Sequence, residues 1–270
     1  MFKWIPLFGG EVLMRTLFAA LLLAGLLGWF LYGKFSGGSW RRATTDYLRA
    51  LVVGLAAARA VEYIVFLPSY LGQGHLVRSW TYLGGCFWPG LAVGLATLWF
   101  FTRRRGDAPW PSVAAGAVTL TFAMAPVWIG ALLDGSAWGA AGDVPWALGP
   151  GQYGVLVPLF AFGPAAAFMP GISAAYTIHP VQVYFALGCL LIGLGGVFLK
   201  KRLAPRPFSA VLVAALALLW FGLGFLRADD PVLFLGLCAP QIMALGGLVW
   251  STAILLTEKK IRVNRPPTAG

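Results

Sequence analysis

The sequence has 270 residues, of which 59% are hydrophobic and only 11% are charged, and its formal net charge is +11. This composition excludes an ordinary soluble domain and indicates an integral membrane protein. It does not indicate nucleic-acid binding, because most of the Lys and Arg residues lie in short clusters between apolar runs, the pattern of cytoplasmic loops that face anionic lipid headgroups. The clusters are Lys34, Arg41 and Arg42; Arg103, Arg104 and Arg105; Lys200, Lys201, Arg202 and Arg206; and Lys259, Lys260, Arg262 and Arg265.

Seven apolar segments are long enough to cross a bilayer, since a spanning helix needs about 20 mostly apolar residues. They cover residues 11–33, 46–68, 80–102, 112–133, 180–199, 208–226 and 232–256. An eighth apolar run, 152–178, contains three prolines and several glycines, and we expect a broken re-entrant or interfacial segment there. The clusters at 103–105 and 200–206 should both be cytoplasmic, so an even number of crossings must separate them. Counting 152–178 as a third crossing would place the cluster at 200–206 outside the cytoplasm. We therefore predict one all-α domain (1–270) with seven transmembrane helices, a periplasmic N-terminus and a cytoplasmic C-terminus.

The first two predicted helices carry opposite charges at helical spacing. Such spacing places the two charges of a pair on one helix face. Charged side chains inside a membrane usually face the bundle interior or a wet cavity. We expect the third of the following pairs to face a functional cavity, and a purely structural ion pair is the alternative. The pairs are Glu11 with Arg15, Asp46 with Arg49, and Arg59 with Glu62.

The stretch 127–148 begins as the end of the fourth predicted helix and becomes a loop rich in Gly, Trp and Asp. It contains Asp134 and Asp143 but no Lys or Arg, and Pro145-Trp146 closes it with a turn and an amphipathic ring. A polar loop beside apolar helices is a place where a membrane enzyme or transporter meets a hydrophilic partner. A plain extracytoplasmic connector is an equally good interpretation.

The fifth predicted helix begins with a run of polar side chains, His179-Pro180-Val181-Gln182-Val183-Tyr184. Imidazole is the common general base near neutral pH, so His179 is a candidate catalytic residue. The sequence shows no Ser, Cys or carboxylate at a spacing that would define its partner. A helix cap or a hydrogen-bonded structural role for His179 therefore remains open.

Two further polar residues lie near the end of the chain. Arg227 ends the sixth predicted helix, where it can bind a phosphate or anchor the helix at the interface. Gln241 lies in the last predicted span and can hydrogen-bond across helices. The three cysteines are unpaired in spacing, and motifs for metals, nucleotides or acyl-enzyme chemistry are absent, so we expect no cofactor and no metal.

Taken in order, these residues resemble the bacterial prolipoprotein diacylglyceryl transferases over nearly the whole chain. The run from His179 to Tyr184 is similar to the family's H-P-x-Q-x-Y. The loop resembles its signature G-R-x-G-N-F-x-N-x-E-x-x-G with the following D-x-P-W, through Gly130, Gly139, Asp143, Pro145 and Trp146.

The resemblance implies an enzyme of the bacterial inner membrane that moves a diacylglyceryl group from a phosphatidylglycerol-like phospholipid to a cysteine thiol or another acceptor. His179 would be the catalytic base. The implied partners are the phospholipid and a lipoprotein precursor. The substrate-binding residues would be Arg15, Arg59, Glu62, Asp134, Asp143, Gln182, Tyr184, Arg227 and Gln241.

Several polar positions of the family are replaced in this chain. Trp128 and Trp220 stand where the resemblance places arginines, Gly224 replaces an acid, Pro89 a histidine and Ser136 a glutamate. A second hypothesis is therefore a non-catalytic relative that binds lipid or lipoprotein or serves as a membrane subunit of a larger assembly. A third is a small transporter built on the Arg59–Glu62 pair, although the internal repeat common in transporters is absent.

Overall fold

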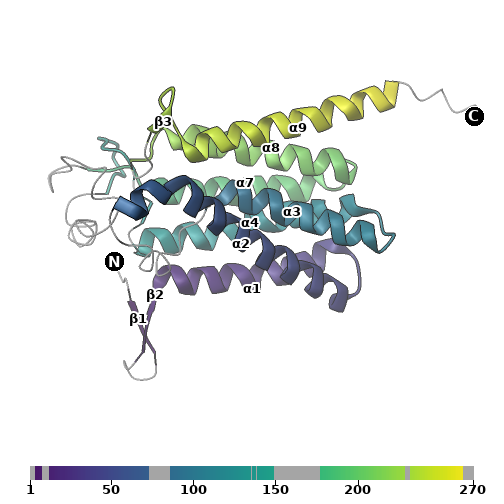
Figure 1. Ribbon diagram of the computed structural model, residues 1–270, viewed down its shortest axis with the longest axis horizontal. Coiled ribbons are helices and arrows are strands. Elements are labelled where there is room, and N and C mark those ends of the chain that lie inside the picture. Colours follow the sequence, from purple (N-terminus) through teal and green to yellow (C-terminus); the bar gives the residue numbers. More distant parts are fainter. Residues whose placement is uncertain are drawn as a thin grey trace, which may run out of the picture.

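The structure, a computed structural model, describes residues 4–7, 12–72, 86–134, 136–137, 139–148, 177–228 and 232–263. Within this part of the chain, helices lying along one long axis form a bundle (Figure 1). They are α1 (Thr16–Ser36), α2 (Trp40–Gly72), α3 (Phe87–Arg104), α4 (Pro109–Asp134), α7 (Val181–Leu199), α8 (Pro205–Gly224) and α9 (Ala239–Val263).

Five of these helices are long and apolar enough to cross a membrane. They are α1, α4, α7, α8 and α9. Their outward faces carry exposed apolar side chains, such as Leu26 on α1, Phe198 on α7 and Val249 on α9. A soluble domain seldom exposes apolar area on this scale. The chain is therefore a mostly helical, multi-pass membrane protein.

The structure corrects the start of the first predicted helix. Trp4–Leu7 (β1) pairs antiparallel with Val12–Arg15 (β2), with Trp4 opposite Arg15, and α1 begins only at Thr16. The prediction of a helical Glu11–Arg15 pair was therefore wrong, because Arg15 belongs to a strand. The Arg15 side chain and Glu11 lie outside the described residues.

The last predicted span also begins too early. Val232–Phe234 (β3) and Leu237–Cys238 (β4) form a second antiparallel hairpin, and α9 starts at Ala239. Its turn has positive φ angles at Leu235 (49°) and Gly236 (77°), a conformation that glycine adopts at little cost. Figure 1 shows this hairpin beyond the end of α8, at the end of the bundle where α9 begins.

Small residues allow α2 and α3 to pack closely. A Cβ atom on Gly54 would lie 2.9 Å from the carbonyl oxygen of Gly90, and one on Gly90 would lie 3.0 Å from the Cβ of Ala58. Close backbone approach at glycines is a common means of helix association in membranes, where burial of apolar side chains gives little driving force. Gly54 and Gly90 therefore let the backbones of α2 and α3 approach each other closely.

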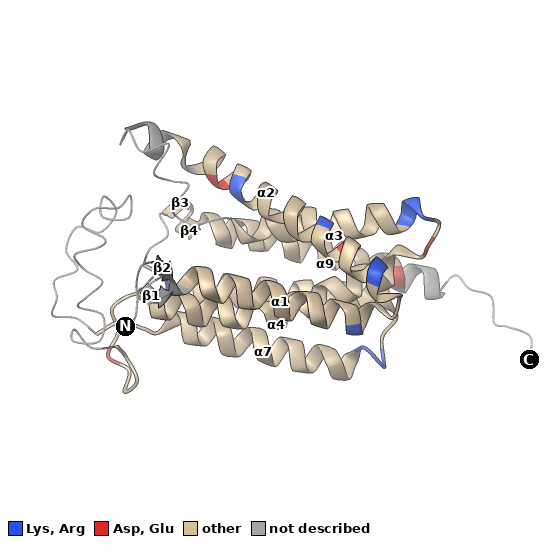
Figure 2. Cartoon of the chain, turned by 90° about the horizontal axis from the view of Figure 1, so that it is seen from below, with Lys and Arg blue, Asp and Glu red and all other residues tan. Residues whose placement is uncertain are grey.

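Three of the four basic clusters, those that begin at Lys34, Arg103 and Lys200, gather at one end of the bundle, where α3 and α7 end and α2 and α8 begin (Figure 2). Here Arg105 binds Asp46 through two hydrogen bonds of 2.6 Å, and Asp46 is only 5% exposed. Asp46 and Arg49 both lie on α2, as their spacing predicts, but they have different partners: the guanidinium of Arg49 lies 4.7 Å from the ring centroid of Phe101. Hydrogen bonding to Asp46 raises the pKa of Arg105. The paired charges join α2 to the end of α3.

Candidate functional site

The loop after α4 is held between the start of α7 and the end of α8. Its Ala140 N–H donates to the Leu226 carbonyl at 2.7 Å, and its Ala140 carbonyl accepts from the His179 N–H at 3.0 Å. Isolated β-bridges join Gly139 to Arg227 and Ala141 to Ile178. The loop therefore brings His179 and Arg227, which are 48 residues apart in numbering (227 minus 179), to the same end of the bundle.

His179 is part of a chain of hydrogen-bonding groups. Its Nδ1 lies 3.4 Å from the hydroxyl oxygen of Tyr184, and that oxygen accepts a 2.6 Å hydrogen bond from the Trp146 indole N–H. An indole N–H can only donate, so the Tyr184 proton is available for Nδ1 of His179. This network places an acceptor at Nδ1 and a proton on Nε2, a tautomer inferred from the hydrogen bonds.

The other edge of the His179 ring packs on the loop backbone. A Cβ atom on Gly142 would lie only 2.2 Å from His179 Nε2, and one on Gly139 would lie 2.1 Å from the His179 carbonyl oxygen. Both positions therefore require a residue without a side chain. His179 is fixed by Tyr184 on one side and by the loop on the other.

We expect Gly142→Ala to destabilise the protein by about 1–2 kcal/mol, because the added methyl group forces the His179 ring or the loop to move. Thermal unfolding of the purified protein in detergent would show this as a lower Tm. Gly246→Ala on α9 is the matched control, since a Cβ there meets nothing within 4 Å. Equal Tm values for the two variants would contradict the described contact.

Gln182 ties the first turn of α7 to the end of α4. Its side-chain Nε2 donates to the Ser136 carbonyl at 2.8 Å, and the residue is 4% exposed. Its Oε1 atom is buried and has no hydrogen-bond partner among the described residues. Gln182 therefore positions the loop through its Nε2 atom, while its Oε1 atom can still accept a hydrogen bond.

The two acids of the loop are Asp143, which contacts Thr177, and Asp134, which ends α4. Asp143 is exposed, and its Oδ1 lies 3.3 Å from the hydroxyl of Thr177, which donates to the Gly142 carbonyl at 2.7 Å. Asp134 is the last residue of α4, and its side chain lies outside the described residues. Thr177 was missed in the sequence, where nothing indicates that it bridges back to a loop more than 30 positions earlier.

Arg227 lies against the aromatic core. Its guanidinium carbon is 5.8 Å from the ring centroid of Trp128, which is a favourable cation–π distance. Trp128 stacks on Phe185 at 4.1 Å and meets Trp220 edge-on at 5.8 Å. The aromatic rings therefore support the guanidinium from inside the bundle.

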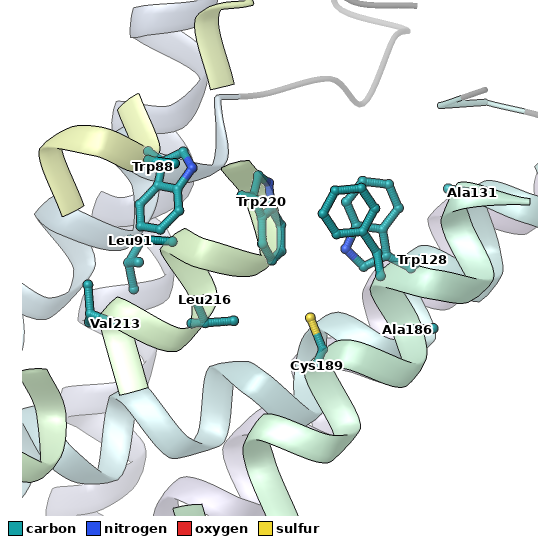
Figure 3. Close-up of a cluster of buried hydrophobic side chains, with 12 residues drawn as sticks. Trp88, Leu91, Trp128, Ala131, Ala186, Cys189, Val213, Leu216 and Trp220 are labelled. Carbon is teal, nitrogen blue, oxygen red and sulfur yellow. The ribbon is translucent and has the colours of Figure 1, made fainter. Parts of the chain in front are cut away.

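The two replaced arginine positions, Trp128 and Trp220, are part of one buried cluster (Figure 3). Phe87 stacks on Trp220 at 4.3 Å, and Trp88 meets the same ring edge-on. The two indoles contact each other and the surrounding rings, so apolar packing fills the positions where the resemblance places arginines. The sequence showed each replacement but not that the two side chains touch.

Gln241 holds the start of α9 against the end of α8, which confirms the predicted hydrogen bond across helices. Its Nε2 donates to the Phe221 carbonyl at 3.1 Å, and its Oε1 accepts from the Cys238 N–H at 3.0 Å. A Cβ on Gly224 would lie 2.5 Å from the Gln241 side chain, so this glycine leaves room for it. Gln241 positions the segment that carries Arg227.

Arg59 and Glu62 on α2 form the ion pair that their spacing predicts. Glu62 is buried, and the guanidinium of Arg59 lies 5.1 Å from the Tyr63 ring centroid. These contacts are all within α2. We predicted that this pair faces a functional cavity, and that stays a prediction. The binding role of Arg15 also stays a prediction. Segments 73–85 and 149–176 lie outside the described residues, and the second contains all but the last two residues of the expected re-entrant run.

Comparisons with known proteins give one consistent result. The family model for prolipoprotein diacylglyceryl transferase matches residues 12–257. Relatives named phosphatidylglycerol–prolipoprotein diacylglyceryl transferase include one from Solidesulfovibrio magneticus, 28% identical over 88% of this chain and 88% of the relative. The relative from Azotobacter vinelandii is 26% identical over 86% of this chain and 88% of its own length. The relative from Gloeobacter violaceus is 25% identical over 92% of this chain and 91% of its own length. The chain belongs to the prolipoprotein diacylglyceryl transferase family.

Proposed function

We propose that this protein transfers a diacylglyceryl group from a phosphatidylglycerol-like phospholipid to the cysteine thiol of a lipoprotein precursor in the bacterial inner membrane. The observation that carries the proposal is the pair of hydrogen bonds that join one loop to His179 and to the segment of Arg227. A base and a cation held by the same loop are the two groups that this transfer requires.

The reaction exchanges a carbon–oxygen bond for a carbon–sulfur bond. The thiol loses its proton, its sulfur bonds to the glyceryl carbon, and the bond from that carbon to the phosphate oxygen breaks. Glycerol phosphate leaves with the electron pair. His179 accepts the thiol proton at Nδ1, with the Tyr184 hydroxyl passing it on, because that hydroxyl lies between Trp146 and the imidazole.

Arg227 binds the phosphate of the donor lipid and stabilises the charge that the leaving group develops. Arg227 is half-buried, and its guanidinium carbon lies 5.8 Å from the centroid of the Trp128 ring. Arg15 and Arg59 are further headgroup ligands in this proposal, with Glu62 fixing Arg59. Asp134, Asp143, Gln182 and Gln241 shape the loop and the segment around the donor. These assignments rest on position and charge.

Arg227→Gln is expected to lower the transfer rate by about 10²-fold, the usual cost of removing one group that stabilises developing charge. The initial rate with a labelled phospholipid measures it. Arg202→Gln at the basic end is the matched control, because it removes a cation that is remote from the reaction. A rate unchanged in Arg227→Gln would remove this residue from the proposed mechanism.

We further propose that all seven described helices cross the membrane. The α2 helix carries several charges, yet it exposes the apolar side chains of Val52, Leu55 and Ile64, which suit contact with lipid. The basic clusters at the ends of α3 and α7 support a cytoplasmic placement for that end of the bundle and a periplasmic placement for the loop of His179. This arrangement puts the N-terminus in the periplasm and the C-terminus in the cytoplasm.

A rescue experiment tests the function. Cells depleted of their own transferase should grow when this chain is expressed, and they should accumulate diacylglyceryl-modified lipoprotein. The Trp128–Trp220 cluster favours one rival, a relative that binds lipid or lipoprotein without transferring it. Stable expression in the membrane without growth or modified lipoprotein would support that rival and overturn the proposal.

A further inference from the structure

A hollow of about 130 Å³ lies where α1 ends and α4 and α8 begin, at the basic end of the bundle. Two buried or half-buried aromatic side chains, Phe35 and Phe208, and two prolines, Pro111 and Pro205, line it. The only charged group in its lining is Lys200, which follows the end of α7. The hollow thus combines an apolar wall with one cation at its rim.

Lys200 is held so that part of its ammonium group remains available. Its Nζ donates to the Phe35 carbonyl at 3.0 Å and lies 4.9 Å from the Phe35 ring centroid. An ammonium group has three donors, and no carboxylate is ion-paired with Lys200 among the described residues. Partial desolvation lowers the pKa of Lys200. An anion in the hollow would offset that penalty.

We propose that this hollow binds the headgroup phosphate of an anionic phospholipid from the leaflet at the basic end. Lys200 contacts the phosphate, and the half-buried Phe35 side chain covers the glycerol carbons, while the acyl chains remain in the bilayer. Lys201 and Arg202 lie next in the chain and are exposed, so they strengthen the preference for a negative headgroup. A zwitterionic lipid has no net negative charge and binds less tightly at this basic rim.

The site is separate from the proposed transfer reaction. Its residues come from α1, α4 and α8 at the ends opposite to the His179 loop, together with the α7–α8 connection. A lipid held there fastens three helices to the membrane surface and does not supply the reacting group. The inference depends on the bundle crossing the membrane but not on its catalytic activity.

Titration of phosphatidylserine into the full-length protein in neutral mixed micelles tests this proposal, with phosphatidylcholine as the comparison lipid. Phosphatidylserine is chosen because the proposed donor is phosphatidylglycerol-like. We expect Lys200→Met to weaken the apparent Kd for phosphatidylserine at least tenfold and to leave that for phosphatidylcholine unchanged. Lys200→Arg should retain the preference, and Lys201→Met, which removes a neighbouring exposed cation, should weaken binding only slightly. Arg227→Gln should leave this binding unchanged.

The rival explanation is that Lys200 only stabilises the carboxyl end of α1 through the Phe35 carbonyl. In that case Lys200→Met would lower the Tm equally in both lipids and leave the phosphatidylserine affinity unchanged, which would overturn the proposal. In a further measurement, inorganic phosphate or glycerol phosphate is added as a competitor of phosphatidylserine. If either competes at the same concentration as the lipid, the hollow is a site for free anions and the lipid assignment is wrong.

Discussion

Replacing His179 with alanine is expected to reduce diacylglyceryl transfer by roughly 10²- to 10⁴-fold, the range for losing a positioned general base. The physical reason is that His179 Nδ1 is the acceptor at the end of the Trp146–Tyr184 hydrogen-bond chain. Initial rates with a cysteine peptide, measured across pH, would show the loss. The corresponding strain should also fail in the rescue experiment.

Tyr184→Phe separates the catalytic role of His179 from a structural one. It removes the hydroxyl that faces Nδ1 but keeps the ring, so the fold should persist while the rate falls and its pH dependence changes. If His179→Ala lowers only the Tm and leaves the rate per folded molecule intact, His179 is a loop anchor. That result would agree with its contacts to Gly142 and would remove it from catalysis.

Replacing Asp46 with alanine is expected to lower the free energy of unfolding by about 2–3 kcal/mol, because charge-assisted hydrogen bonds to buried groups are among the strongest. Asp46 is nearly inaccessible and accepts two 2.6 Å bonds from Arg105. Arg105 is one-third exposed, so water compensates part of the loss. Denaturant unfolding in detergent measures the change.

Asp107→Ala is the matched control for this ion pair. Asp107 also contacts Arg105, at 3.4 Å, but its side chain is half exposed, and we expect a change of less than about 0.5 kcal/mol. Transfer activity per folded molecule should be the same in both variants, because this end of the bundle is remote from the His179 loop. Similar losses in the two variants would mean that the buried pair is not the main contact.

Hydropathy predicted where the helices lie but not where several of them begin: α3, for example, starts at Phe87 and not at residue 80. The run from Val232 to Cys238 is as apolar as the helix that follows, so composition could not separate them. The positive φ angles at Leu235 and Gly236 reverse the chain there, so these residues form a hairpin and not a helix. Similarly, β2 ends at Arg15 and α1 begins at Thr16, with no glycine or proline between them to mark the change. Apolar length fixes the amount of chain that can enter a membrane, while backbone turns fix the helix ends.

Local spacing predicted which charges share a helix face but not every partner. Arg59 and Glu62 pair with each other on α2, whereas Asp46 pairs with Arg105, 59 residues away, through two hydrogen bonds. The His179 motif was visible in the sequence, but its Trp146–Tyr184 contact was not, because it joins a loop to a helix. Contacts between distant segments require the fold.

The most direct measurement uses the purified protein in vesicles that contain labelled phosphatidylglycerol, with a peptide that carries a single cysteine. Mass spectrometry of the peptide and assay of released glycerol phosphate follow both products of one reaction. The account predicts a diacylglyceryl thioether on the cysteine and glycerol phosphate in equal amounts, both lost in His179→Ala. Lipid that binds to folded protein while neither product forms would contradict it.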